Sequence, residues 1–456
     1  MDEPLKPTYY STVDEIYHCE AVVPILARQE LLRRSIRRLW PQGHPTRLVQ
    51  VAGTAGKGST CRFLEMGLGC FGRSGAFSSP EVFDYRERFS VGGAPVAREE
   101  VTAAWQSRVK PLAVELALGS PGQVLFFHEV NILLALVLFE QHGVEWAAVE
   151  TAVGGRYDQT TALDAAATVL TNVGADHEEE LGPTPWQRAL DKAGIARRGV
   201  PFFTAETEPA LLALIAGVCA EAGAPFHAVG AAEVAALGEL MAAAAPGGPP
   251  PEALLSAARQ QRNAALALAV IRELFPRAEP PRIVAELLSA RLPGRFWKVE
   301  ERLYADIAHN PDKVAALAEE VERRFAGLDK VFVVGVTRGR PARAVLAPLV
   351  KLARVMVVTR ATLDGQDPQQ VEQAIAGLGA GAFTLVVPEP QKALAVARAM
   401  CGERDVVVVA GDMDMLDEAL NPDPFLRHLN ATVGWRTRAV DQPAEPAPPD
   451  PFPPRP

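Results

Sequence analysis

Residues 47–60 read RLVQVAGTAGKGST, and this stretch decides the fold of the first part of the chain. Residues 47–52 predict a buried strand, and the glycine-rich GTAGKGST that follows opens a helix. Glycines let successive backbone N–H groups converge on a polyphosphate, and a helix N-terminus adds partial positive charge. Lys57 can reach the β- and γ-phosphates, and Ser59 or Thr60 can place a hydroxyl on Mg²⁺. The stretch therefore predicts a nucleotide-binding loop.

The loop differs in two places from the common G-x-x-x-x-G-K-[ST] pattern. Val51 stands where that pattern begins with glycine, and Gly58 separates Lys57 from Ser59. A flexible strand–helix turn with a solvated lysine is the alternative interpretation. Glycines, a lysine and two hydroxyls placed together between a strand and a helix favour nucleotide binding.

Strands and helices alternate on the C-terminal side of this loop. Apolar strands end at Glu150 (WAAVE) and at Asn172 (TVLTN), and helical patterns such as 130–141 lie between and after them. This alternation predicts parallel βαβ units. Helices are also predicted for residues 11–40 and 251–274, because apolar residues recur there at helical spacing.

A segment rich in Ala, Gly and Pro follows this first series of strands and helices. Residues 231–251 carry this composition, which predicts a surface excursion rather than a packed element. After Leu292-Pro293-Gly294-Arg295 a second alternating series begins. Its predicted strands are 331–336, 355–359, 384–387 and 406–410. The helix before the first of these strands places apolar residues on one face: Val314, Leu317, Val321 and Phe325.

The predicted fold class is α/β. A P-loop parallel-sheet ATP-binding domain at 1–293 is followed by a smaller Rossmann-like α/β domain at 294–438. Residues 439–456 hold too much proline and too little apolar material to pack, so we predict a disordered tail.

Composition narrows the classes of function. Of 456 residues, 48% are hydrophobic and 22% are charged, which is typical of a globular protein. The net charge of −9 argues against broad nucleic-acid binding, which needs a surplus of Lys and Arg. Five widely spaced cysteines without a C-x-x-C predict a reducing compartment. The first ten residues lack a secretory pattern, and apolar runs such as 132–139 are too short to cross a bilayer. We expect a cytoplasmic protein without nucleic-acid or membrane partners.

Acids and a histidine follow the predicted strands. Glu150 ends its strand, and a carboxylate at the carboxyl end of a parallel strand points into the ligand crevice. Such a carboxylate suits Mg²⁺, although an ordinary strand-end acid is the alternative. His177 follows the next strand, and a lone histidine is usually a surface or core residue. Ser79, in FSSPEV, is also compatible with a plain turn, and Lys192, in DKAGI, is also compatible with a helix end.

Taken together, these segments resemble the Mur ligase superfamily, and most closely its folylpolyglutamate synthase/dihydrofolate synthase branch. The resemblance extends over about residues 10–420, in the same order and with similar spacing. The segments that carry it are VAGTAGKGST (51–60), SSPEVFDYRER (78–88), ETAVGGRYDQTT (150–161), TNVGADHEEELGPT (171–184), DKAGI (191–195), RQQRNAALALA (259–269), LPGRF (292–296) and DIAHNP (306–311).

The resemblance implies an ATP-dependent carboxylate–amine ligase that uses one or two Mg²⁺ ions. In the family, a substrate carboxylate attacks the γ-phosphate to give an acyl phosphate, and the amine of an amino acid then displaces phosphate. For this branch the implied acid is a folate and the implied amino acid is L-glutamate. We expect a monomer.

The resemblance also implies a set of site residues. Nucleotide-binding positions are Gly53, Thr54, Gly56, Lys57, Gly58, Ser59, Thr60, Gln260, Asn263, Arg295 and Asp306. Metal ligands are Ser59, Ser79, Glu150 and His177. Catalytic positions are Lys57, Lys192, Arg295 and His309, and the family carbamylates the lysine that matches Lys192. Because Lys57 and Arg295 belong to different domains, closure of the two domains is expected to be a condition of catalysis.

Departures from the family pattern gather on the side of the acid and the amino acid. Ala55 replaces an Asn, Arg259 replaces a His, TRGR at 337–340 replaces an Asp-Lys-Asp stretch, and Gly411-Asp412 replaces Gly-Ser. Two alternatives therefore stay open: a Mur-type ligase for a different acid or amino acid, and a nucleotide-binding protein without ligase activity. Arg338 or Arg340 can bind the carboxylate of an amino acid, and solvated surface arginines are the alternative.

Overall fold

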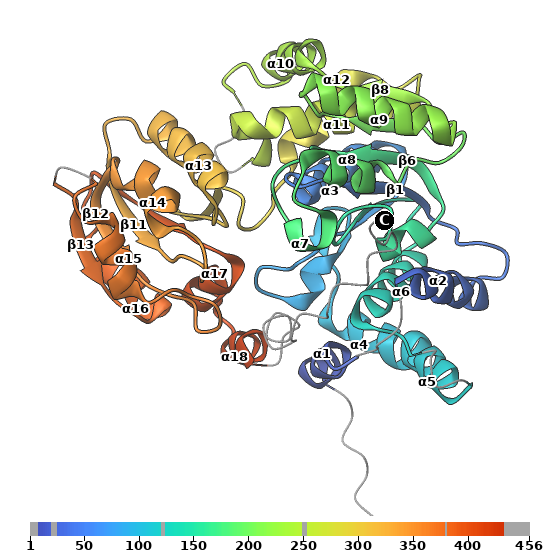
Figure 1. Ribbon diagram of the computed structural model, residues 1–456, viewed down its shortest axis with the longest axis horizontal. Coiled ribbons are helices and arrows are strands. Elements are labelled where there is room, and N and C mark those ends of the chain that lie inside the picture. The colour runs from blue at the N-terminus through green and yellow to red at the C-terminus, as the bar shows by residue number, and fades with distance from the viewer. Residues whose placement is uncertain (1–7, 20–24, 120–123, 249–252, 379–380, 433–456) are drawn as a thin grey trace, which may run out of the picture.

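In a computed structural model, the described residues 8–19, 25–119, 124–248, 253–378 and 381–432 form two α/β domains, each built around one sheet (Figure 1). This arrangement confirms the predicted fold class. The proline-rich tail predicted at 439–456 lies outside the described residues. Residue 294 precedes the first strand of the second sheet, and the exact limits of the domains stay a prediction.

The first domain contains an eight-stranded sheet in the order β4-β3-β2-β5-β1-β6-β7-β8. Strands β2, β5, β1, β6, β7 and β8 are parallel, and β3 and β4 are antiparallel to their neighbours. The strands are β1 (Arg47–Ala52), β2 (Ser74–Phe77), β3 (Phe89–Val91), β4 (Ala94–Pro95), β5 (Trp146–Glu150), β6 (Ala165–Leu170), β7 (Phe202–Thr204) and β8 (Phe226–Ala228). Buried side chains from β1 and β5 enter the cores on both faces of the sheet, which explains their continuous apolar sequences.

Two helical layers cover this sheet (Figure 1). On one face the core includes side chains of α1 (Tyr9–Tyr17), α2 (Ile25–Leu39), α4 (Arg98–Ala104), α5 (Lys110–Gly119) and α6 (Phe127–Gln141). On the other face it includes side chains of α3 (Lys57–Leu68), α10 (Ala231–Ala244), α11 (Ala258–Leu274) and α12 (Pro280–Ser289). Next in the chain come α7 (Glu178–Leu181), α8 (Pro185–Ala193) and α9 (Pro209–Ala222), and residues of α8 and α9 share a small core with Leu170 of β6 and Phe202 of β7.

Three predicted segments need correction. The helix predicted for 11–40 is two helices, because α1 ends at Tyr17 and α2 begins at Ile25. The helix predicted for 251–274 begins only at Ala258, since residue 257 is extended and a short 3₁₀ turn precedes it. The predicted excursion 231–251 contains α10, whose Leu237 and Met241 are buried; its many alanines favour a helix, which the Gly and Pro content concealed.

The second domain contains a six-stranded sheet in the order β13-β12-β11-β14-β10-β9, in which only β9 is antiparallel. Its strands are β9 (Trp297–Glu300), β10 (Leu303–Asp306), β11 (Asp329–Val334), β12 (Ala353–Val358), β13 (Phe383–Val386) and β14 (Asp405–Ala410). Its helices are α13 (Pro311–Arg324), α14 (Ala342–Val350), α15 (Pro368–Ile375), α16 (Pro390–Met400), α17 (Met413–Leu420) and α18 (Pro424–Thr432). The four strands predicted here are confirmed to within two residues, and three of the four apolar residues predicted on one face of α13 are buried.

Each domain places a segment on the other. Leu426 and Leu429 of α18 are buried in the core of the first domain, and Phe425 contacts Tyr10 of α1 with ring centroids 5.7 Å apart. In the opposite direction, Val82 is buried in the core of the second domain. The carbonyl of Phe83 accepts hydrogen bonds from Asn421 and Asn430, each at 3.1 Å. The two domains are therefore joined by packing on one side as well as by the chain at residue 294 (Figure 1).

The predictions about the cysteines and about membrane-spanning segments can be compared with the described part of the chain. All five cysteines lie in it, and none forms a disulfide. None of the helices in the described ranges has both the length and the apolar character needed to cross a membrane.

Candidate active site

The predicted nucleotide-binding loop, residues 53–60 and here called the phosphate loop, lies at the carboxyl end of β1, the strand between β5 and β6 in the sheet. Its backbone is held by the end of β6: Thr54 N donates to the carbonyl of Asn172 at 3.1 Å, and Ala55 N donates to Asn172 Oδ1 at 2.9 Å. At Gly53 the backbone φ is +145°, and a Cβ would lie 1.8 Å from Thr171 Oγ1. Only glycine fits this position, because a side chain would collide with the neighbouring strand.

The first turn of α3 presents polar groups that lack protein partners. Gly56 caps the helix in the left-handed conformation, and Lys57 is its first residue. Lys57 Nζ lies 3.2 Å from the carbonyl of Gly53 and 3.8 Å from Glu150 Oε1. The hydroxyls of Ser59 and Thr60 are buried, and neither has a hydrogen-bond partner. Buried hydroxyls are normally paired, so this turn fits a ligand with several oxygen atoms, such as a triphosphate with its cation.

Glu150 places a carboxylate beside this turn. It ends β5, is buried, and its Oε2 accepts the N–H of Ser79 at 3.2 Å. Burial raises the pKa of the Glu150 carboxyl above its usual value, although Lys57 and the Ser79 N–H act to lower it. A hard cation would stabilise the ionised carboxylate, and the oxygen atoms of Ser59 and Glu150 are the kind of donor that Mg²⁺ prefers.

His177 lies at the start of a short helix. It is exposed, caps the short helix α7 with a left-handed φ of +53°, and lies 3.8 Å from Glu180. Within the described ranges no three His, Cys, Asp or Glu side chains gather to form a metal site. The assignment of His177 and Ser79 as metal ligands therefore stays a prediction.

Lys192 lies beneath the loop rather than at the helix surface. Its side chain is buried in α8, and Nζ lies 3.4 Å from the carbonyl of Gly53. Burial, reinforced by the nearby charge of Lys57, lowers the pKa of its ammonium group to about 8, while Asp191 acts in the opposite direction. A substantial neutral fraction near physiological pH makes this amine reactive.

Helix α11 brings two predicted nucleotide-binding residues to the loop. Asn263 Nδ2 donates to Gln260 Oε1 at 2.8 Å, and Gln260 is buried. A Cβ at Gly56 would lie 2.6 Å from Asn263 Oδ1, so the amide packs directly against the loop backbone.

The second domain contributes Arg295, Asp306 and His309. Asp306 ends β10, and its Oδ2 accepts the N–H of Phe296 at 2.8 Å, which fixes the chain beside Arg295. The Arg295 charge acts on the Glu150 carboxyl of the first domain. Burial, followed by the charges of Lys313 and Arg340, lowers the pKa of His309 to about 3. Charged residues predicted on the two domains thus lie close enough to influence one another electrostatically.

Arg338 and Arg340, whose roles the sequence left open, lie in different environments. Arg340 is half-buried, and its charge acts on His309 and Lys313. Arg338 is exposed, with its guanidinium 4.0 Å from Asp364. Of the two, Arg340 is the one whose charge acts on His309 and Lys313.

Several residues around the phosphate loop and His309 were not singled out from the sequence. Asn172 and Thr171 hold the loop. Their signal was the strand end TVLTN and the TNVGADHEEELGPT segment of the resemblance, but neither residue was given a role. Lys313 lies one helical turn after His309, where an ordinary solvated lysine was the natural interpretation. Asp176 acts electrostatically on both Lys192 and Lys313.

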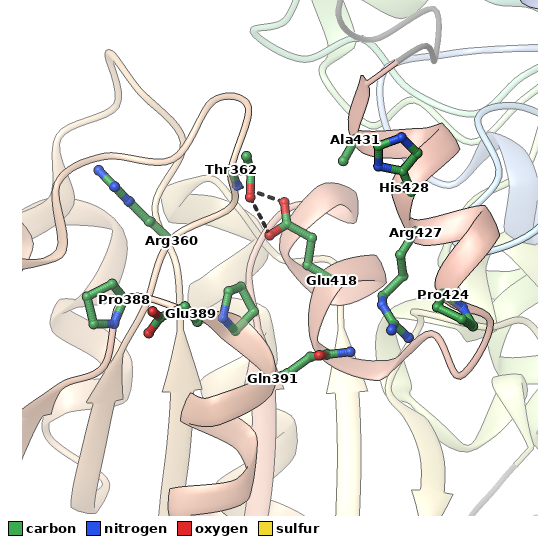
Figure 2. A pocket seen from close by; sticks show the side chains of 11 residues that line it. Arg360, Thr362, Pro388, Glu389, Gln391, Glu418, Pro424, Arg427, His428 and Ala431 are labelled. Carbon is green, nitrogen blue, oxygen red and sulfur yellow. Dashed lines mark hydrogen bonds between the residues drawn. The ribbon is translucent and has the colours of Figure 1, made fainter.

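A separate depression of about 460 Å³ opens on the second domain, between the ends of β12 and β13 and helix α18 (Figure 2). One wall is fixed by Glu418, whose carboxylate accepts from Thr362 N at 2.7 Å and from Thr362 Oγ1 at 2.8 Å (Figure 2). The charged side chains around it include Arg360, Arg427 and Glu389. None of the predicted site residues lines this depression, and we assign it no role.

The close packing at Gly56 leads to a prediction for which Gly43 is a matched control. Gly56 (φ +83°) and Gly43 (φ +87°) share a backbone conformation, but a Cβ at Gly43 has nothing within 4 Å. Alanine at either position should cost about 1–2 kcal/mol of backbone strain. Only Gly56→Ala should also displace Asn263 and weaken ATP binding, by about 10-fold or more, since each 1.4 kcal/mol is tenfold. Calorimetric titration of both variants with ATP checks this, and equal affinities would show that the contact with Asn263 is unimportant.

Comparisons with known proteins extend these observations. The family model "Mur ligase, glutamate ligase domain" matches residues 294–413. The dihydrofolate synthase/folylpolyglutamate synthase of Bacillus subtilis is 32% identical over 332 residues, which is 69% of this chain and 77% of that protein. The protein of the same name from Escherichia coli is 33% identical over 369 residues, covering 79% and 83% of the two chains. The solved structure of E. coli FolC in complex with DHPP and ADP has a TM-score of 0.72 at 25% identity, covering 90% of this chain and 97% of that one.

Proposed function

The chain belongs to the dihydrofolate synthase/folylpolyglutamate synthase family of Mur ligases, and from this premise we propose that it is an ATP-dependent ligase that adds L-glutamate to a folate. The observation that carries the proposal is that charged groups of the two domains lie close enough to act on one another electrostatically beside the phosphate loop. Arg295 acts on Glu150, and Lys57 acts on Lys313. A cleft of this kind suits a reaction in which two anions, a carboxylate and ATP, must be brought together.

The reaction that we propose has two steps. The folate carboxylate attacks the γ-phosphorus, so that an acyl phosphate forms and ADP leaves. The glutamate amine then attacks the acyl carbon, phosphate leaves, and the amine gives up its proton. Lys57 and Arg295 would neutralise the charge of the phosphates during the first step, and the second domain would shield the acyl phosphate from water.

The nucleotide and the metal would be held by the residues already described. The backbone of Gly53, Thr54, Gly56 and Gly58 suits the phosphates. Gln260 and Asn263 suit the nucleotide from the side of α11. Asp306 suits it from the second domain, where His309 follows three residues later in the chain. A divalent cation, when bound, neutralises phosphate oxygens during phosphoryl transfer. Ser59 and Glu150 would supply oxygen ligands, with Ser79 beside them, and His177 would belong to a second ion.

Lys192 is proposed to carry a carbamate. Its neutral amine would attack the carbon of CO₂, an N–C bond would form, and a proton would leave the nitrogen for solvent. Burial and the pKa of about 8 support this, because only the neutral amine reacts. The carbamate would place a negative charge beside the loop, where it can orient a cation.

A different amino acid or acid is the second candidate. Two of the departures from the family pattern meet in space, because Thr337 Oγ1 donates to Asp412 Oδ2 at 2.8 Å. They lie at the carboxyl ends of β11 and β14, near Arg340. This altered corner is where a change in the specificity for the amino acid would arise.

Purified protein incubated with ATP, Mg²⁺ and a panel of folates and amino acids tests the proposal. ADP release that requires both a folate and glutamate, together with a product heavier by one glutamyl residue, would support it. Ligation of another pair would establish the second candidate, and ATP binding without any turnover would leave a nucleotide-binding protein. We also propose that the protein is a cytoplasmic monomer, since one chain supplies both walls of the cleft; light scattering checks the mass.

A further inference from the structure

The hydrogen bonds of His309 define where its proton lies. Nδ1 is 2.9 Å from the carbonyl of Ile307, which can only accept, so Nδ1 carries the hydrogen. The ring is neutral, since burial and neighbouring cations lower the pKa of His309 to about 3. Nε2 therefore holds a lone pair, and it lies 3.3 Å from Nζ of Lys313. Lys313 is the donor of this contact, and two further hydrogens of its ammonium group remain for another acceptor.

Lys313 occupies a position that is unfavourable for a cation. It lies in the first turn of the 14-residue helix α13, where the helix dipole is positive. It is half-buried, and Arg295, Lys57 and Arg340 all act to lower the pKa of its ammonium group, with Asp176 opposing them. Within the described residues no carboxylate lies at ion-pair distance from it. A cation in such a place is stabilised only when an anion joins it.

We propose that Lys313 is a further catalytic residue, which contacts the phosphates of the nucleotide from the second domain, and that His309 is the positioning residue that holds its ammonium group. The inference rests on the proposed ligase function. It adds a cation to those predicted from the sequence. It also defines the part played by His309, whose ring accepts one hydrogen of Lys313 and so directs the others toward the cleft.

Lys313→Met tests the contact with phosphate, because methionine keeps the length of the stem and removes the charge. ATP affinity is expected to fall about 10-fold and kcat about 100-fold, a typical effect of removing one donor to a transition state. The binding of adenosine, which has no phosphates, should not change, and the KM for glutamate should change little. Lys313→Arg should recover part of kcat, whereas a purely structural lysine would give no such pattern.

Lys392→Met is the matched control, since Lys392 also lies in the first turn of a helix but its side chain is 72% exposed. It should behave as the wild type. Melting temperatures show whether each variant is folded. A folded Lys313→Met protein with wild-type ATP affinity and kcat would overturn the proposal. If the wild type binds ATP but ligates no folate, the proposed function fails, while the ATP titration still decides the role of Lys313.

A double-mutant cycle tests the positioning role of His309. His309→Ala should lower kcat in the wild-type background, because the ammonium group loses its acceptor. In the Lys313→Met background the same change should lower kcat no further. Fully additive losses would show that His309 acts independently of Lys313 and would overturn this part of the inference.

Discussion

Lys57→Ala is expected to lower the kcat of glutamate-dependent ADP release by about 1,000-fold, the upper range for loss of one charged group at a transition state. Lys57 Nζ lies between the Gly53 carbonyl and Glu150, so its removal takes away the cation nearest to the phosphate loop. The buried carboxyl of Glu150 also loses the neighbour that does most to lower its pKa. The pKa of Glu150 should then rise further, and more Mg²⁺ should be needed for half-maximal activity.

Steady-state ADP release at several Mg²⁺ concentrations measures both effects. Lys392→Ala, at an exposed position on α16, is the control and should leave kcat and the Mg²⁺ requirement unchanged. Wild-type rates in a folded Lys57→Ala protein would show that the nucleotide is bound elsewhere.

Lys192→Ala is expected to lower kcat by about 100-fold or more, because one oriented charged group beside the transferring phosphoryl group is lost. The truncation leaves space beneath the loop, since the lysine side chain is buried there. A short carboxylic acid such as acetate can enter this space and replace the carboxylate of the proposed carbamate. Added acetate should therefore restore part of the activity of Lys192→Ala and leave that of the wild type unchanged.

The carbamate also predicts a dependence on pH and CO₂. The neutral fraction of the Lys192 amine increases as the pH rises through its pKa of about 8. Wild-type protein depleted of CO₂ should lose activity, and at a fixed concentration of dissolved CO₂ the activity should return faster above pH 8 than near pH 6. Lys192→Arg, which keeps a positive charge but cannot form the carbamate, should respond to neither treatment. Full activity of Lys192→Arg would remove the carbamate from the mechanism.

Much of the fold could be predicted because its signals are local. The strand β1, the glycines of the loop and the start of α3 are adjacent in the chain, and the four strands predicted in the second domain are continuous apolar runs. Composition misled only where local signals conflict, as in α10, where glycine and proline surround a segment of strong helix formers.

In the candidate site, too, residues in local motifs could be predicted, whereas contacts between distant residues could not. Motifs predicted Lys57, Glu150 and Arg295, whose positions depend on strand ends and on the turn after Gly294. The sequence could not distinguish Arg340 from Arg338, because two residues in one loop face the cleft or the solvent according to the path of the backbone. It also provided no reason to choose Lys313 from the other lysines of the chain.

Patterns of neighbouring residues were enough to predict a glycine-rich loop after the first strand, two successive α/β domains, and charged residues at strand ends. These are properties of neighbouring residues, and short-range sterics and hydrogen bonding are enough to produce them. Packing of the chain was needed to show which groups meet: Lys313 beside His309, Asn172 on the loop, and α18 against the first domain. Such contacts join residues distant in the chain, and they depend on how the two sheets pack, which no local pattern encodes.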